Sequence, residues 1–335
     1  MKITVFGAGA VGGHLAARLA AASPRTGDEI AAVARGAQFA AIAERGLTLL
    51  IGDERITGRP RATDRPETLG AQDIVIVTLK SSVLAGAAPA IAALIGQQTS
   101  VVFAMNGIPW WYLHRLGDGG GPQPDLSRLD PGGGLARHIG AERVIGCMIN
   151  SANEVVAPGL VRNSPMTRNR FTLGEPDGTL SRRLEMVAAR LEAAGIPAPV
   201  TRTIRVEIWD KLVRNLSTAP ICALTGEPIA VLGRHPELLS LARRLMREGL
   251  SVAAAHGIQL DIEVERAYGE RPNSPHKSSM LQDFERGRPP EINGILIAVQ
   301  AFARAAGVPT PYLDTVAALI VEKARRAGLY PNAPV

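Results

Sequence analysis

The sequence predicts an α/β fold in which a doubly wound, mostly parallel sheet is followed by an all-α domain. Short apolar strands alternate with helices through the first half of the chain, and helical periodicity takes over from about Arg205. The 335 residues are enough for two domains. We place the boundary after the proline-containing stretch Ile196–Val200, which gives domains at 1–202 and 203–335.

The first domain is expected to follow a strand–helix alternation. A nearly continuous apolar run, as in Asp73–Leu79, is typical of a parallel strand that is covered on both faces. The expected strands are Lys2–Phe6, Ile30–Ala34, Asp73–Leu79, Val101–Ala104, Arg143–Met148, Glu154–Val156, Leu160–Arg162 and Phe171–Leu173, with a hairpin at Leu47–Ile51 and Arg55–Thr57. The expected helices are Ala10–Ala22, Gln38–Glu44 and Ser181–Ala194.

The second domain is expected to be helical throughout. Its expected helices are Val206–Leu216, Glu237–Ala255, Ile262–Ala267, Ser278–Glu285, Ile292–Ala306 and Leu313–Arg325. The glycine-rich stretch 117–134 is interpreted as an exposed loop without chemically active residues. A cleft between the two domains is the expected ligand site.

Composition excludes several classes of function. Hydrophobic residues make up 46% and charged residues 20% of the chain, so we expect a packed core and no disorder. The net charge of +6 comes from scattered Lys and Arg, which argues against nucleic acid and is compatible with a phosphorylated small ligand. Cys147 and Cys222 lack a partner motif, and the six His residues lack metal-ligand spacing, so no metal is expected. Without a signal peptide or a bilayer-spanning run, we expect a cytoplasmic protein with no membrane partner.

The strongest motif is the glycine fingerprint that joins the first strand to the first helix. Its residues are Gly7, Ala8, Gly9, Ala10, Val11 and Gly12. Gly7 allows a tight turn, Gly9 lets the backbone approach a pyrophosphate, and Gly12 lets the helix pack closely on the strand. The N–H groups of the helix N-terminus attract phosphate. This context predicts a Rossmann-type dinucleotide site.

Residues at the ends of later strands select the dinucleotide and border the cleft. The second strand ends at Val33-Ala34-Arg35 with no carboxylate directly after it, and the planar fork of Arg35 suits the 2′-phosphate of NADPH. Lys80 and Asn106 end two further strands at the carboxyl edge of the sheet. We expect both to face the nicotinamide end of the ligand.

The helical domain offers residues for the chemistry of carbonyl reduction. Lys211 and Asn215 are four residues apart on one expected helix, so both can point into one cleft. A lysine that is partly desolvated beside a cationic cofactor ring can have a lowered pKa and serve as a general acid. Pro289-Pro290 should start a helix with Glu291 in its first turn. From spacing alone, a surface lysine and a helix-start acid remain alternative interpretations.

Several strings in this order resemble the ketopantoate reductase (2-dehydropantoate 2-reductase) family. The resemblance runs from the glycine fingerprint to Pro309-Thr310-Pro311. Its most specific pieces are Val77-Thr78-Leu79-Lys80, Asn106-Gly107, Glu207-Ile208-Trp209-Asp210-Lys211-Leu212, Ser278-Ser279-Met280-Leu281-Gln282-Asp283 and the run Arg286–Glu291. Several unrelated strings in the right order are harder to match by chance than one.

The resemblance implies reduction of ketopantoate to (R)-pantoate with NADPH, on the route to pantothenate and coenzyme A. It also implies a C-terminal domain of the 6-phosphogluconate dehydrogenase type. By position, Lys211 resembles the general acid of the family and Glu291 its second catalytic residue. Asn215 and Ser279 resemble residues that bind substrate, as does Lys211 itself. Arg35, Lys80 and Asn106 resemble cofactor-side residues, and Asn106 also borders the substrate.

Two departures from the family pattern bear on the substrate. Ala219 stands where the family usually carries a second substrate Asn, and Asn293 and Leu296-Ile297 stand where it usually reads Asp and Asn-Gly. Trp110-Trp111 is interpreted as an addition near the cleft mouth. Fewer hydrogen-bond partners change discrimination between substrates. The alternatives are therefore a related reductase of another 2-oxo or 3-oxo acid and an NADPH-binding sensor without turnover, while a monomer and a homodimer both remain open.

Overall fold

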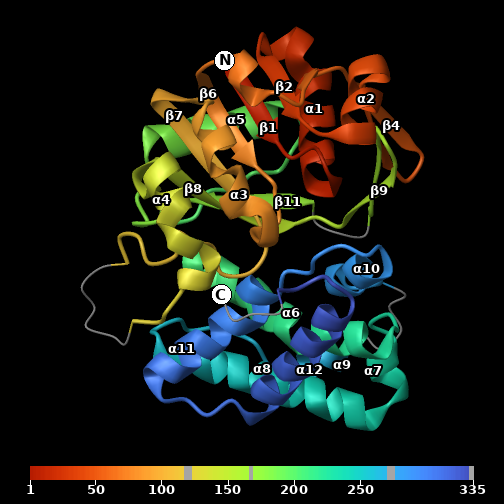
Figure 1. Ribbon diagram of the computed structural model, residues 1–335, viewed down its shortest axis with the longest axis vertical. Coiled ribbons are helices and arrows are strands. Elements are labelled where there is room, and N and C mark those ends of the chain that lie inside the picture. Colours follow the sequence, from red (N-terminus) through yellow and green to blue (C-terminus); the bar gives the residue numbers. More distant parts are fainter. Residues whose placement is uncertain (117–122, 166–168, 270–275, 332–335) are drawn as a thin grey trace. The chain divides into compact units, whose positions relative to one another are not determined.

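The computed structural model describes residues 1–116, 123–165, 169–269 and 276–331, which form two compact units (Figure 1). The first unit comprises 1–105, 111–116 and 133–204. The second comprises 106–110, 117–132 and 205–335, as far as these residues are described. Residues 117–122 of the glycine-rich stretch lie outside the described residues. The chain therefore leaves the first unit briefly after residue 105, well before it enters the helical region at Arg205.

A seven-stranded sheet forms the centre of the first unit. Its strand order is β11-β8-β7-β6-β1-β2-β5, and every neighbouring pair is parallel except β11 with β8. The strands are β1 (Lys2–Phe6), β2 (Glu29–Val33), β5 (Arg61–Thr63), β6 (Gln72–Val77), β7 (Ile95–Ala104), β8 (Val144–Asn150) and β11 (Arg170–Gly174). The expected doubly wound, mostly parallel sheet is confirmed.

Alternating side chains bury both faces of this sheet. Ile3, Val5, Ile74 and Ile76 belong to a core that also includes apolar residues of α1 and α5. Neighbouring residues such as Val75 point to the opposite face and are equally buried. The helices of this unit are α1 (Ala10–Thr26), α2 (Gly36–Arg45), α3 (Ser81–Ala92), α4 (Gly134–Ile139) and α5 (Arg182–Ala193). Among the described residues before α6, short 3₁₀ turns also occur at Pro66–Leu69 and Ala141–Arg143 of this unit, and at Ser127–Leu129 and Pro131–Gly133.

A second, four-stranded sheet, in the order β4-β3-β10-β9, packs against α1. Its strands are β3 (Leu47–Ile51), β4 (Glu54–Gly58), β9 (Asn153–Ala157) and β10 (Leu160–Asn163). The expected hairpin is present as β3–β4, but β3 also pairs in parallel with β10. Gly58 allows the close approach to α1, because a methyl group there would lie 2.3 Å from the Ala17 carbonyl oxygen.

The second unit is helical, as expected. It contains α6 (Ile204–Thr225), α7 (Val231–Arg234), α8 (Pro236–Ala255), α9 (Val264–Gly269), α10 (Ser279–Glu285), a π-helical turn (Asn293–Ile297), α11 (Ala298–Ala306) and α12 (Pro311–Arg326). Trp209 of α6 packs edge-on against Phe302 of α11, with ring centroids 5.3 Å apart. Within the part of the chain that the structure describes, no helix is both long and apolar enough to cross a bilayer.

Four local expectations need correction. The helix expected to end at Leu216 continues through Pro220 to Thr225, because its packed faces outweigh the local cost of proline. Helix α3 was not expected at all, since its Ala-rich sequence has little periodicity. Part of the expected loop 117–134 forms 3₁₀ turns before α4 begins at Gly134. Trp111 is a core residue of the first unit rather than a cleft-mouth addition, because it is 2% exposed and its ring contacts Gly146.

Candidate active site

The glycine loop is a compact turn at the carboxyl edge of the main sheet. The main-chain N–H groups of Gly7 and Ala8 both donate to Val33 O of the neighbouring strand, each at 3.1 Å. Gly7 has φ +101°, which suits glycine. A methyl group on Gly12 would lie 2.1 Å from Gly7 O, so Gly12 is required for packing. On Gly9 the same methyl group would meet no described protein atom within 4 Å.

Two side chains to which the sequence analysis assigned no role hold this loop. Thr78, at the end of β6, donates from Oγ1 to Gly7 O at 2.5 Å. Gln38 of α2 donates from Nε2 to Ala8 O at 2.6 Å, and its Oε1 accepts from Gly159 N at 3.0 Å. Thr78 belongs to the family-like string Val77–Lys80 and Gln38 to no motif, and only the tertiary contacts give either side chain this role.

The first turn of α1 has no side chain that caps its N–H groups. Gly9 is its N-cap and supplies no capping side chain, and no acidic residue lies in the first turn. The N–H groups of Ala10 and Val11 therefore lack the usual side-chain acceptors. Arg35 is exposed directly after β2 as the N-cap of α2, and Lys80 follows β6 as the N-cap of α3. These donors are compatible with the phosphates of a dinucleotide.

Helix α1 carries a buried histidine on its inner face. His14 is 1% exposed and its Nδ1 lies 2.8 Å from Asn153 Oδ1. Burial lowers the pKa of His14 from 6.5 to about 4; the hydrogen bond to Asn153 opposes that shift, and the nearby charge of Arg18 adds to it. This histidine is therefore neutral at neutral pH and serves the packing of the first unit.

Three candidate polar residues meet within the second unit. Lys211 Nζ donates to Asn106 Oδ1 at 2.6 Å, and Asn106 Nδ2 donates to Glu291 Oε2 at 3.1 Å. Glu291 is 7% exposed, whereas Lys211 and Asn106 are half-buried. Because Glu291 can only accept when ionised, it turns the Asn106 amide so that Oδ1 faces the lysine.

Close backbone packing brings these residues together. Ile108 N donates to Gly294 O at 2.8 Å. Gly107 has φ +74°, and a methyl group there would lie 2.6 Å from Gly294 C and O. Gly294 lies in the π-helical turn three residues after Glu291, so this contact sets Asn106 beside the carboxylate. Such single π turns occur frequently at functional sites.

Asn215 lies on α6, Ser279 lies near it, and the helix expected to contain Glu291 begins one residue after it. Asn215 lies one turn after Lys211 on α6 and is half-buried. Ser278 caps α10 by accepting from Leu281 N, and its hydroxyl donates to Ala219 O at 3.5 Å, which sets exposed Ser279 near α6. Glu291 lies just before the helical residues rather than in their first turn, since its carbonyl accepts the first helical bond, from Ile295 N.

The departure at Asn293 has a structural explanation. Asn293 Oδ1 accepts from the Tyr330 hydroxyl at 2.6 Å, and its Nδ2 lies 3.5 Å from Arg128 O. An amide can accept and donate at once, which a carboxylate in the same place cannot do. Leu296 is completely buried. These residues therefore hold the second unit together.

Family models match both parts of the chain. The model described as ketopantoate reductase PanE/ApbA matches residues 3–110, and its C-terminal counterpart matches 203–324. A 2-dehydropantoate 2-reductase from Mesorhizobium japonicum is 45% identical over 333 residues, which cover 98% of this chain and all of that relative. The chain belongs to the ketopantoate reductase family.

Solved structures of other proteins have the same fold. A 2-dehydropantoate 2-reductase from Geobacter metallireducens GS-15 superposes with a TM-score of 0.82 at 27% identity and covers 97% of this chain and 100% of its own. A D-mandelate dehydrogenase, solved with NADH and anilino(oxo)acetate, reaches a TM-score of 0.80 at 21% identity and covers 98% and 100%. At that identity the second likeness concerns the fold alone.

Proposed function

We propose that the protein reduces the 2-oxo group of ketopantoate to (R)-pantoate with NADPH, on the route to pantothenate and coenzyme A. The observation that carries the proposal is the hydrogen-bonded set Lys211–Asn106–Glu291 in a chain of this family. We assign dinucleotide binding to residues 1–202 and catalysis to 203–335.

The residues of the glycine loop fit NADPH. The open space at Gly9 and the uncapped first turn of α1 accommodate a pyrophosphate, and exposed Arg35 offers a charged fork to the 2′-phosphate. When bound, NADPH supplies the hydride. Lys80 is proposed as a further residue on the cofactor side.

Lys211 is the proposed general acid. Hydride addition to a carbonyl carbon leaves negative charge on the oxygen, which an ammonium group neutralises by giving up a proton. Asn106 Oδ1 already accepts one N–H of Lys211 at 2.6 Å, so two N–H bonds of the ammonium remain for substrate and its other neighbours. Glu291 acts on the lysine through Asn106, whose amide it orients.

Asn215 and Ser279 are the proposed substrate-binding residues beside Lys211. Ala219 is 4% exposed and offers only a methyl group where the family usually has an amide. The substrate therefore finds one fewer hydrogen-bonding side chain on α6. This departure is the observation that favours the second candidate, reduction of another 2-oxoacid by the same residues.

The test is NADPH consumption by the purified protein with ketopantoate, pyruvate and a bulkier 2-oxoacid. Turnover selective for ketopantoate supports the proposal, and selective turnover of another acid supports the second candidate. Binding of NADPH without turnover of any of the three contradicts both and favours a sensor. For the cofactor, Arg35→Ala should raise KM for NADPH about tenfold and leave KM for NADH unchanged, because a charge-assisted bond is lost. Arg55→Ala, at another exposed arginine of the first unit, is the matched control.

A further inference from the structure

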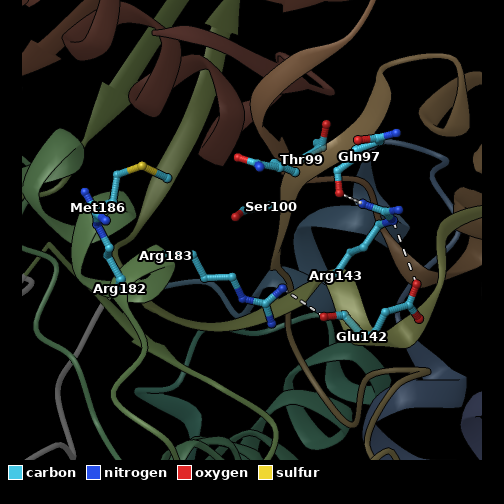
Figure 2. Close-up of a pocket in the computed structure, with 9 residues that line it drawn as sticks. Gln97, Thr99, Ser100, Glu142, Arg143, Arg182, Arg183 and Met186 are labelled. Carbon is cyan, nitrogen blue, oxygen red and sulfur yellow. Dashed lines mark hydrogen bonds and ion pairs between the residues drawn. The ribbon is translucent and has the colours of Figure 1, made fainter.

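A second polar cavity lies in the first unit at the amino-terminal half of β7, whereas Asn106 follows the carboxyl end of that strand. Its volume is about 680 Å³, which is in the range of small-molecule sites. It is lined by strand residues, by the turn before β8 and by the start of α5: Gln97, Gln98, Thr99, Ser100, Glu142, Arg143, Arg182, Arg183 and Met186 (Figure 2).

Arginines make up most of the charged side chains of the lining. Three of its side chains are arginines and one is a glutamate. Arg143 donates to the carbonyls of Gly96 and Gln97, each at 2.9 Å. Arg183 donates to Glu175 Oε1 at 2.8 Å and to Oε2 at 2.6 Å, and Glu175 is 3% exposed. These bonds hold two guanidinium groups in place. Arg143 retains N–H donors, whereas Arg183 also donates to Glu142 O at 2.8 Å and to Val144 O at 3.3 Å, so at most one of its N–H groups remains.

Arg182 lacks a comparable structural role. It is exposed and makes no ion pair or hydrogen bond within the described ranges. It lies in the first turn of the twelve-residue helix α5, where the helix dipole disfavours a cation. Arg183 in the same turn is compensated by Glu175, whereas an anion in the cavity would compensate Arg182.

Ser100 adds a hydroxyl group to the lining. The residue is 1% exposed and borders the cavity. Its neighbour Thr99 points elsewhere and donates to Gln72 O at 2.6 Å. In Figure 2, Ser100 lies between the side of Arg182 and Met186 and the side of Gln97 and Arg143. A hydroxyl at the wall of a cavity can donate a hydrogen bond to a ligand there.

We infer that this cavity binds a small molecule through a phosphate group. A phosphate offers three strong acceptor oxygens and close to two negative charges, which suit guanidinium and hydroxyl donors. Glu142 does not block it, because its side chain is 60% exposed and lies 3.8 Å from Arg143 Nε at the rim. The carboxamides of Gln97 and Gln98 and the thioether of Met186 would contact the rest of the ligand.

The test is calorimetric titration of the NADPH-saturated protein with inorganic pyrophosphate, since NADPH already occupies the glycine loop. We expect one pyrophosphate per chain. Arg182→Ala should weaken binding about tenfold or more and Ser100→Ala about fivefold, without a change in Tm. Arg55→Ala, which removes the same charge elsewhere in the first unit, should leave the affinity unchanged.

Three results would overturn the inference. One is the absence of pyrophosphate binding to the wild-type protein, and another is wild-type affinity in both cavity variants. The third is an equal loss in Arg55→Ala and Arg182→Ala, which would indicate attraction to net charge only. The outcome does not depend on which 2-oxoacid the protein reduces.

Discussion

The two units carry their candidate residues in different ways. In the first unit, Gly7–Gly12 lie next to one another in the chain and act through main-chain geometry. In the second, Lys211 and Glu291 stand 105 and 185 positions from Asn106, and hydrogen bonds between side chains join all three. A local main-chain turn depends on which residue types fit it, whereas a long-range set of side chains depends on how helices pack. The variants below test this difference, from the largest expected effect to the smallest.

Lys211→Ala should show most clearly that catalysis depends on the second unit and NADPH binding on the first. Loss of the proposed general acid should lower kcat about 10²- to 10⁴-fold. The dissociation constant of NADPH, measured by fluorescence titration, should not change, because the glycine loop is untouched. If Lys211→Ala retained wild-type turnover, Lys211 would not be the acid.

Asn106→Ala tests whether the side chains act as a set. The change removes the bonds to both Lys211 and Glu291, and we expect kcat to fall about 10²-fold as the lysine loses its orientation. The pH profile of kcat should also shift, since the ammonium loses an acceptor at 2.6 Å. A purely structural role would lower Tm and leave that profile in place. Asn215→Ala is the comparison, because it should chiefly raise KM for the oxoacid.

A pair of glycine variants tests the main-chain site. Gly9→Ala adds a methyl group where no described protein atom lies within 4 Å, so Tm should stay the same while KM for NADPH rises about tenfold or more. Gly12→Ala places its methyl group 2.1 Å from Gly7 O and should lower Tm by several degrees. Equal effects of the two changes on Tm would contradict the distinct roles of these glycines.

The smallest effect concerns stability rather than activity. The pKa of His14 falls from 6.5 to about 4 on folding. Between these pH values the imidazole is therefore protonated in the unfolded chain and neutral in the folded chain. Stability from this group is therefore complete above about pH 6.5 and decreases as the pH falls toward 4. Between about pH 7 and pH 5, the wild-type protein should lose about 2 kcal/mol of unfolding free energy through His14, and His14→Gln should not show this part of the loss. Urea unfolding of both proteins at the two pH values measures this, and parallel losses would contradict it.

The comparison also explains which expectations from the sequence were accurate. The parallel sheet was predictable because buried strands such as β6 are short, apolar and β-branched. The hairpin β3–β4 was predictable, but its parallel pairing with β10 was not, since more than 100 residues separate the two strands. Helix α3 and the extension of α6 past Pro220 were missed because packing, rather than local propensity, stabilises them.

The sequence by itself determined the fold class, the glycine loop and the identity of Lys211 and Glu291 as candidates, because each depends on residue type, order or spacing along the chain. Only the tertiary structure decided that Asn106 joins these two, that Gln38 and Thr78 hold the loop, and that Ser100 and three arginines line one cavity. The physical reason is that hydrogen bonds form between groups within about 3 Å of one another, whatever their separation in the chain.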